Sequence, residues 1–209
     1  MRARFPEAHE AAPDREQPHV LTGAFELGPL DLRKGTITEV VAPFAGCGAG
    51  LLLGELLQHD RTCRELIALI DGSDAFDPWS ICPEALERLL WARCKEPAMA
   101  IKAADLLLRD GNMPLVILDL QSHAPKALQR FPSSVWHRLR MLAEKSACCL
   151  CAFTPVRMVS CARTRVRMTG GFQLSHFYQD RAVLLSELSF QIDRQQTKVL
   201  TPEPVRVTA

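Results

Sequence analysis

The chain has 209 residues, of which 47% are apolar and 23% are charged, and its formal net charge at pH 7 is +1. This composition is typical of a globular protein with one sizeable core, and the near-neutral charge excludes a general attraction to nucleic acid or membranes. No apolar run is long enough to cross a bilayer, and residues 1–18 do not read as a signal peptide. We therefore expect a cytoplasmic protein whose binding surfaces arise from local clusters of charge.

The composition changes along the chain in a way that predicts one domain with two tails. Residues 1–18 are charged and contain almost nothing to bury, which predicts a disordered N-terminal arm. Residues 19–195 carry the alternating apolar segments of a folded core. Residues 196–209 are predicted to form a flexible C-terminal tail.

Strands and helices alternate through the predicted core. A β-branched strand at 36–41 leads through a glycine-containing loop at 42–50 into a buried helix at 51–57. Further strands are predicted at 65–70, 90–93, 115–118 and 147–153 and within 183–192, and further helices at 84–90, 97–109 and 133–143. Because several strands are apolar throughout, we expect an α/β fold with a mostly parallel central sheet and helices on both faces.

Eight cysteines raise the question of a metal site, but no two of them form a Cys-x-x-Cys pair. Strand alternation would place Cys149 and Cys151 on the same face, with no histidine nearby in the sequence. Two such cysteines make a poor zinc site. We therefore predict no metal centre, and we interpret the cysteines as small buried residues in a reducing compartment.

The glycine loop has the placement of a phosphate-binding P-loop, between a strand and a helix. A P-loop needs a lysine for phosphate charge and a Ser or Thr hydroxyl for Mg²⁺. With Gly48 as the second glycine of that motif, Pro43 replaces the first glycine, Ala49 replaces the lysine and Gly50 replaces the hydroxyl residue. The degenerate loop thus comprises Pro43, Gly46, Gly48, Ala49 and Gly50. Two interpretations stay open: a tight turn, and residual ATP binding.

Four segments in succession resemble the bacterial recombinase RecA. They are Lys34-Gly-Thr-Ile-Thr-Glu-Val with its loop, Ile70-Asp-Gly-Ser-Asp-Ala-Phe-Asp-Pro, Pro114-Leu-Val-Ile-Leu-Asp, and Val156-Arg-Met with Thr169-Gly-Gly. The resemblance implies a RecA-like core in which Asp119 stands at the position linked to Mg²⁺. It also implies that Ser73 replaces the acid that activates water, and that Thr154 or Pro155 replaces the residue that senses the γ-phosphate. No catalytic residue and no required cofactor are therefore expected.

This short, motif-poor form is most similar to the ImuA group of RecA relatives, which accompany an error-prone polymerase in the bacterial damage response. The resemblance implies a non-catalytic accessory protein of translesion synthesis and SOS-associated DNA repair. An error-prone polymerase-like protein and RecA would be its protein partners, with DNA as a further candidate ligand. Two alternatives stay open: a degenerate RecA-like ATPase of DNA recombination, and a SulA-type inhibitor of cell division.

A basic segment offers the clearest candidate binding surface. Arg157, Arg163, Arg165 and Arg167 lie in a stretch that contains no acidic residue. Since guanidinium groups bind phosphates well, we interpret them as candidates for contact with DNA or an acidic partner. The alternative is a solvated surface loop. Unpaired cations are costly to bury, so we expect an exposed loop or edge strand.

Overall fold

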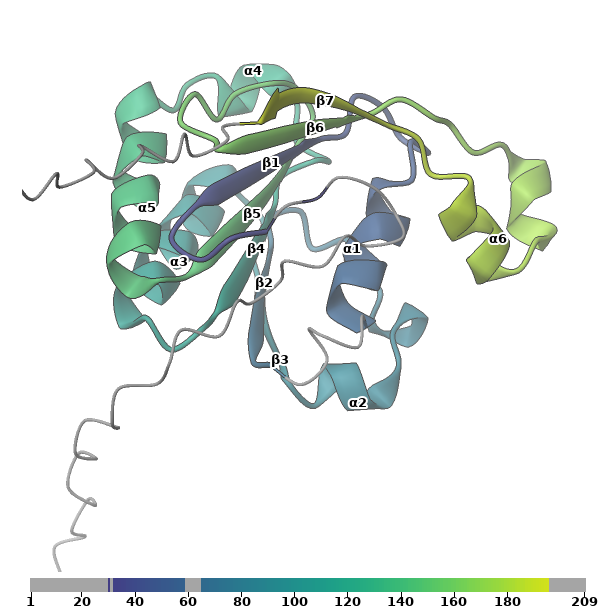
Figure 1. Cartoon of the computed structure of the whole chain (residues 1–209), viewed down its shortest axis with the longest axis horizontal. Helices are drawn as coiled ribbons and strands as arrows, with labels where there is room; N and C mark the ends of the chain where they lie inside the picture. The colour runs from purple at the N-terminus through teal and green to yellow at the C-terminus, as the bar shows by residue number, and fades with distance from the viewer. Residues whose placement is uncertain (1–29, 31, 59–64, 196–209) are drawn as a thin grey trace, which may run out of the picture.

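The structure is a computed structural model, and it describes residues 30, 32–58 and 65–195 (Figure 1). The predicted disordered arm and the predicted flexible tail lie outside the described residues. Among the described helices, none is both long and apolar enough to span a membrane.

Seven strands form one sheet in the order β3-β2-β4-β5-β1-β6-β7 (Figure 1). The strands are β1 (Ile37–Val41), β2 (Ile67–Asp71), β3 (Leu89–Arg93), β4 (Leu115–Asp119), β5 (Cys149–Thr154), β6 (Thr164–Met168) and β7 (Phe190–Gln195). Every neighbouring pair is parallel except β6 and β7, which are antiparallel. The predicted α/β fold with a mostly parallel sheet is confirmed.

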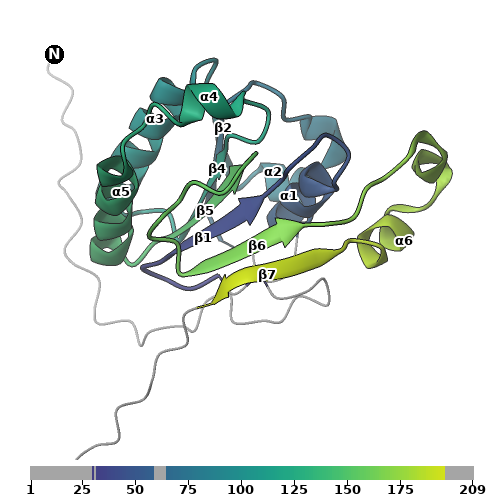
Figure 2. The same ribbon diagram turned by 90° about the horizontal axis from the view of Figure 1, so that it is seen from above.

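Helices cover both faces of this sheet (Figures 1 and 2). One face carries α1 (Ala49–Gln58) and α2 (Pro83–Leu86). The other carries α3 (Pro97–Asp110), α4 (Pro125–Leu128) and α5 (Ser133–Ser146). Two 3₁₀ turns, η1 (Pro78–Ser80) and η2 (Leu174–Tyr178), and helix α6 (Arg181–Ser186) complete the described elements. This architecture is consistent with a RecA-like core.

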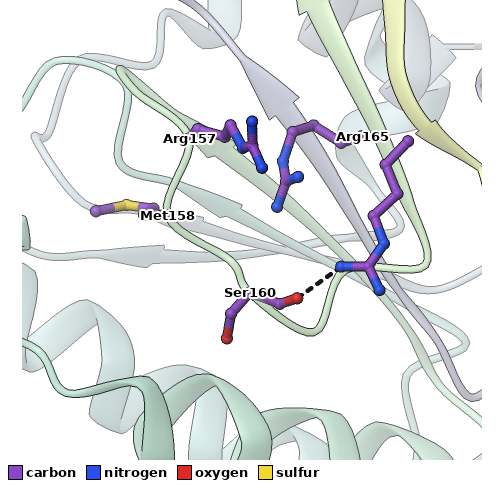
Figure 3. Close-up of a pocket in the computed structure, with 5 residues that line it drawn as sticks. Arg157, Met158, Ser160 and Arg165 are labelled. Atoms are coloured by element: carbon purple, nitrogen blue, oxygen red, sulfur yellow. Dashed lines mark hydrogen bonds between the residues drawn. The ribbon is translucent and has the colours of Figure 1, made fainter.

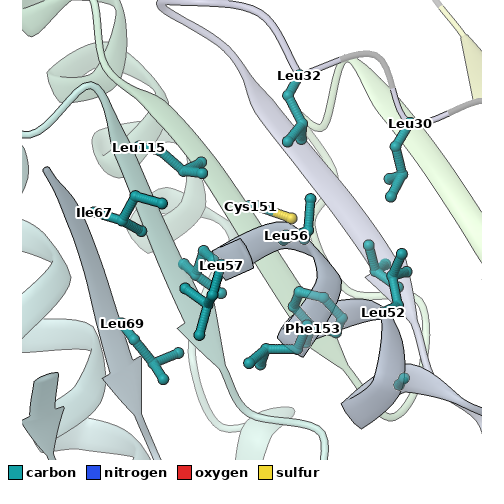
Figure 4. Packing of buried hydrophobic residues seen from close by; sticks show 14 of the residues in the cluster. Leu30, Leu32, Leu52, Leu56, Leu57, Ile67, Leu69, Leu115, Cys151 and Phe153 are labelled. Atoms are coloured by element: carbon teal, nitrogen blue, oxygen red, sulfur yellow. The ribbon is translucent and has the colours of Figure 1, made fainter. Parts of the chain in front are cut away.

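The apolar strands of the sequence follow from this two-sided cover. In β4, Leu115 and Ile117 face the cluster under α1, and Val116 and Leu118 face the cluster under α3 and α5. All four side chains are at most 1% exposed. Figure 4 shows the first cluster, in which leucines of α1 pack over strand residues such as Phe153. A strand buried on both faces cannot alternate, so the continuous apolar runs predicted a covered sheet correctly.

Five of the described cysteines are buried, as predicted, whereas Cys82 and Cys161 are partly exposed. Cys149 and Cys151 both lie in the core cluster on the α1 face of β5. Burial raises the pKa of the Cys151 thiol to about 12, which keeps it protonated and unreactive near neutral pH. The described residues contain no group of three or more side chains suited to hold a metal ion.

Two predicted elements differ from those in the structure. The predicted helix at 84–90 ends early, since α2 stops at Leu86 and Leu89 begins β3. The strands expected within 183–192 were only partly correct, because helix α6 takes residues 181–186. Strand β7 begins at Phe190, opposite Met168 of β6. A short apolar run such as Ala182–Leu185 fits a helix as well as a strand, and pairing with β6 decides where the strand begins.

The carboxyl ends of β2 and β4 approach each other closely at Gly72. Its amide donates to the carbonyl oxygen of Asp119 over 2.9 Å, and an added Cβ would lie 2.4 Å from that same oxygen. We expect Gly72→Ala to lower the free energy of unfolding by about 2–3 kcal/mol, because the strand ends would have to separate. Urea denaturation followed by circular dichroism measures this effect.

Helix α1 supplies the matched control for that substitution. A Cβ added at Gly50 meets nothing within 4 Å, so Gly50→Ala should raise stability by up to about 1 kcal/mol through helix propensity. Equal effects of the two substitutions would contradict the close approach at Gly72.

Candidate functional site

The glycine loop connects β1 to α1, as the P-loop interpretation requires. Gly46 and Gly48 have φ angles of 84° and 90°, in the left-handed region that favours glycine. The loop therefore has the tight, glycine-dependent turn from strand to helix that the sequence predicted.

Side chains of the segment between β6 and β7 pack against this loop at Gly48, while residues 43–46 remain exposed. A Cβ added at Gly48 would lie 2.4 Å from Leu188 Cδ2 and 2.7 Å from Phe172 Cε2. The amide of Phe172 donates to the carbonyl oxygen of Gly46 over 2.8 Å, which fixes the covering segment to the loop. The space over Gly48 is thus filled by apolar groups of the segment between β6 and β7.

The three substituted motif positions differ in exposure. Ala49 is 3% exposed and packs in the core under α1, so the position offers no room for a charged amine. Gly50 is exposed, and Pro43 is exposed at the start of the loop. Neither side chain can hold a phosphate or a metal ion.

Asp71, at the carboxyl end of β2, is committed to local structure. Its carboxylate accepts hydrogen bonds from the amides of Ser73, Ala75 and Phe76 at 3.3, 3.0 and 2.9 Å. Trp91 Nε1 donates a further bond over 3.3 Å. The side chain is fully buried. Four donors satisfy the carboxylate, so Asp71 folds the 72–76 loop and has little capacity left for a ligand.

Asp74 and Asp77 are turn residues. Asp74 has a left-handed φ of 52° and pairs with Arg93 over 2.6 Å, and the Arg93 guanidinium holds the pKa of Asp74 below its usual range. Asp77 accepts a hydrogen bond from the amide of Trp79 and caps η1. The Ser73 hydroxyl, at the position of the missing acid, is buried without a hydrogen-bond partner among the described residues.

Asp119 ends β4 directly opposite Asp71 in the sheet register. Its carboxylate accepts from the amide and the side-chain Nε2 of Gln121, both over 3.0 Å. Burial raises the pKa of Asp119, and the neighbouring Asp71 charge raises it further. His123 Nε2 lies 2.7 Å from the carbonyl oxygen of Gly72 beside it. The local arrangement is a partly buried carboxylate held by its own turn.

The fold brings Asp71 and Asp119 together but separates them from the glycine loop. Strand β5 lies between β4 and β1, so the loop and Asp119 follow strands that are not neighbours. Within the described part of the chain, no hydrogen bond or ion pair joins Asp119 to loop 42–50.

The prediction of an exposed loop or edge strand was wrong for Arg165 and Arg167, and it holds for Arg157, which is exposed in the β5–β6 crossover. The arginine segment contributes β6, which has β1 on one side and β7 on the other. Arg165 is 3% exposed, and its Nε donates to the buried carboxylate of Glu39 on β1 over 2.5 Å. Its Nη2 donates to the carbonyl oxygen of Val159 over 2.6 Å. Burial is tolerated because a carboxylate more than a hundred residues away in the sequence pairs with the guanidinium.

The other three arginines differ from Arg165. Arg167 is partly buried and pairs with Asp193 of β7 over 2.8 Å. Arg163 is partly exposed, and its Nε is buried without a hydrogen-bond partner among the described atoms. Arg157 is exposed. The segment is therefore part structural and part accessible, and its role in binding stays a prediction.

A pocket opens beside this segment, with a volume of about 300 Å³. Figure 3 shows it between the β5–β6 crossover and the strands β6 and β7. Its lining comprises Arg157, Met158, Ser160, Arg165 and Arg194. Three of these five side chains are cationic and none is acidic, which makes the pocket a candidate site for an anion.

Sequence reasoning missed Glu39, Phe172, Leu188 and Arg194. A charged residue within the β-branched strand at 36–41 was a signal for Glu39, since a covered strand buries charge only beside a partner. No comparable signal existed for the other three, because their roles depend on contacts between distant segments.

The fold and the site together define a mostly parallel α/β protein with a P-loop-like turn against which Phe172 and Leu188 pack at Gly48. No protein-family model matches the chain, and neither does any curated protein sequence.

Proposed function

We propose that the chain is a non-catalytic RecA-like accessory protein of the bacterial DNA damage response, acting in the cytoplasm in translesion synthesis. It would act by binding partner proteins, with DNA as a further ligand. The observation that carries the proposal is a glycine loop with Ala49 and Gly50 at the lysine and hydroxyl positions, where Phe172 and Leu188 occupy the space beside Gly48.

The chemistry of phosphoryl transfer supports this conclusion. Such enzymes work almost entirely by positioning phosphates and stabilising charge with lysine, arginine and Mg²⁺. Here Ala49 is buried in the core and Gly50 has no side chain to bind a metal. Ser73 stands where the resemblance calls for an acid. A protein of this fold without those groups can still use its surface.

Exposed apolar side chains offer that surface. Trp79 in η1 and Tyr178 in η2 are 94% and 95% exposed, and Leu174 in η2 is 83% exposed. Large apolar groups in contact with water are typical of protein-binding sites, where aromatic residues contribute most of the affinity. The η2 turn lies in the same β6–β7 connection that packs against the glycine loop.

Capture of partners from DNA-damaged bacterial cells tests the proposal. The tagged full-length chain should recover components of an error-prone polymerase or RecA, identified by mass spectrometry. A variant that carries both Leu174→Ser and Tyr178→Ser should recover about tenfold less of these partner proteins. Both side chains are exposed and unneeded for folding, so the loss would reflect binding. Met141→Ser, on the exposed face of α5, is the matched control and should keep recovery.

A SulA-type division inhibitor is the second candidate, because it would also bind partners without nucleotide chemistry. Recovery of the division tubulin alone, without polymerase components or RecA, would favour that candidate and contradict the adaptor. The third candidate, a degenerate ATPase, is supported by one observation, the partly buried carboxylate of Asp119 at the carboxyl end of β4. It requires saturable ATP binding.

A further inference from the structure

The arginine-lined pocket lies over strands β1 and β6, on the face of the sheet that also carries α3 and α5. The crossover 155–163 is hydrogen-bonded to the side chains of Glu39 on β1 and Arg165 on β6. The Glu39 carboxylate accepts from the amides of Met158 and Val159 at 2.8 and 3.0 Å, which fixes the crossover in place. The pocket therefore has a rigid floor with a buried guanidinium in it.

The charges of the pocket do not balance. Glu39 neutralises Arg165 through their ion pair. Arg157 and Arg194 have no carboxylate within salt-bridge distance among the described residues. Arg194 is held in place, because its Nη1 donates to the carbonyl oxygen of Ser160 over 2.7 Å. Two uncompensated positive charges therefore line one pocket, and an anion seated there would relieve their repulsion.

We propose that this pocket binds a phosphate group, with Arg157 and Arg194 as its principal ligands. Guanidinium groups match phosphate oxygens with paired hydrogen bonds, and a partly enclosed site strengthens them. Figure 3 shows the Arg157 and Arg165 side chains directed into the same pocket. This inference deepens the proposed binding function and rests on it for the source of the phosphate.

The phosphate can come from a free phosphate-bearing molecule or from the backbone of a nucleic acid. Arg165 shapes the floor of the site and is left unchanged in the test, since its removal would damage the fold. The test variant is Arg157→Gln with Arg194→Gln. Its matched control is Arg88→Gln with Lys95→Gln, which removes the same charge beside β3, at the opposite edge of the sheet.

Calorimetric titration with inorganic phosphate at constant ionic strength is the first arm. We expect saturable binding by the wild-type chain and the control variant, and at least about tenfold weaker binding by the test variant. Absence of phosphate binding by the wild-type chain, or binding that the test variant retains in full, would overturn the proposal.

Fluorescence anisotropy with a labelled single-stranded oligothymidine is the second arm, and it identifies the source. Competition by inorganic phosphate and loss of binding in the test variant would assign the pocket to a nucleic-acid backbone. Phosphate binding that is sensitive to the test variant, without oligonucleotide binding, would assign it to a free phosphate-bearing molecule. That second result would support the phosphate site and would contradict DNA as a ligand in the proposed function. Failure of the partner capture, by contrast, leaves both arms unaffected.

Discussion

The variant Glu39→Leu is expected to lose about 3–5 kcal/mol of unfolding free energy, because it leaves a buried cation without its partner. The Glu39 carboxylate also accepts from the Thr154 hydroxyl over 3.1 Å and from two amides of the crossover. All these donors lie at buried or partly buried positions, and each would lose its acceptor. Few single substitutions in this chain remove as many buried interactions.

Arg165→Met should cost less than Glu39→Leu, because the three remaining donors still stabilise the Glu39 carboxylate. Arg167→Met is the matched control on the same strand, since its pair with Asp193 is partly exposed and should contribute below about 1 kcal/mol. Urea denaturation of Glu39→Leu, Arg165→Met and Arg167→Met gives the free energy of unfolding of each variant and so their order of stability. Equal stability of the Arg165 and Arg167 variants would contradict a structural ion pair under the crossover.

Asp71→Ala is expected to lower the unfolding free energy by about 3 kcal/mol or more, because three amides and an indole N–H lose their acceptor. The site is fully buried, so water cannot replace the carboxylate without opening the loop. Tryptophan emission should change as well, since Trp91 Nε1 donates to Asp71.

Asp77→Ala is the control for Asp71→Ala. It removes a side-chain cap from η1 at an exposed position and should cost no more than about 1 kcal/mol. An Asp71→Ala variant as stable as the wild-type chain would show that the 72–76 loop does not depend on this carboxylate.

The elements of the fold were predictable because they follow from local patterns. Helix α3 has Pro97 in its first turn and the left-handed Gly111 at its end, with φ of 74°, both visible in the sequence. Strand β4 is indicated by four consecutive apolar residues before Asp119. The turn character of Asp74 and Asp77 was also predictable, because Asp before Pro and Gly-Ser-Asp sequences favour turns.

The features that decide the site depend on pairs of distant segments. Arg165 looks like one of four surface arginines until the sheet order places Glu39 beside it. The glycine loop looks open until the β6–β7 connection brings Phe172 and Leu188 over Gly48. Neither contact leaves a periodic trace, since each is made by side chains from segments more than a hundred residues apart.

Titration of the purified full-length chain with Mg-ATP shows whether the glycine loop still serves nucleotide chemistry. We predict no saturable binding up to about 1 mM, the upper range of ordinary substrate affinities, and no hydrolysis above background with or without single-stranded DNA. Saturable ATP binding, with DNA-stimulated turnover that disappears in Asp119→Asn, would contradict the account.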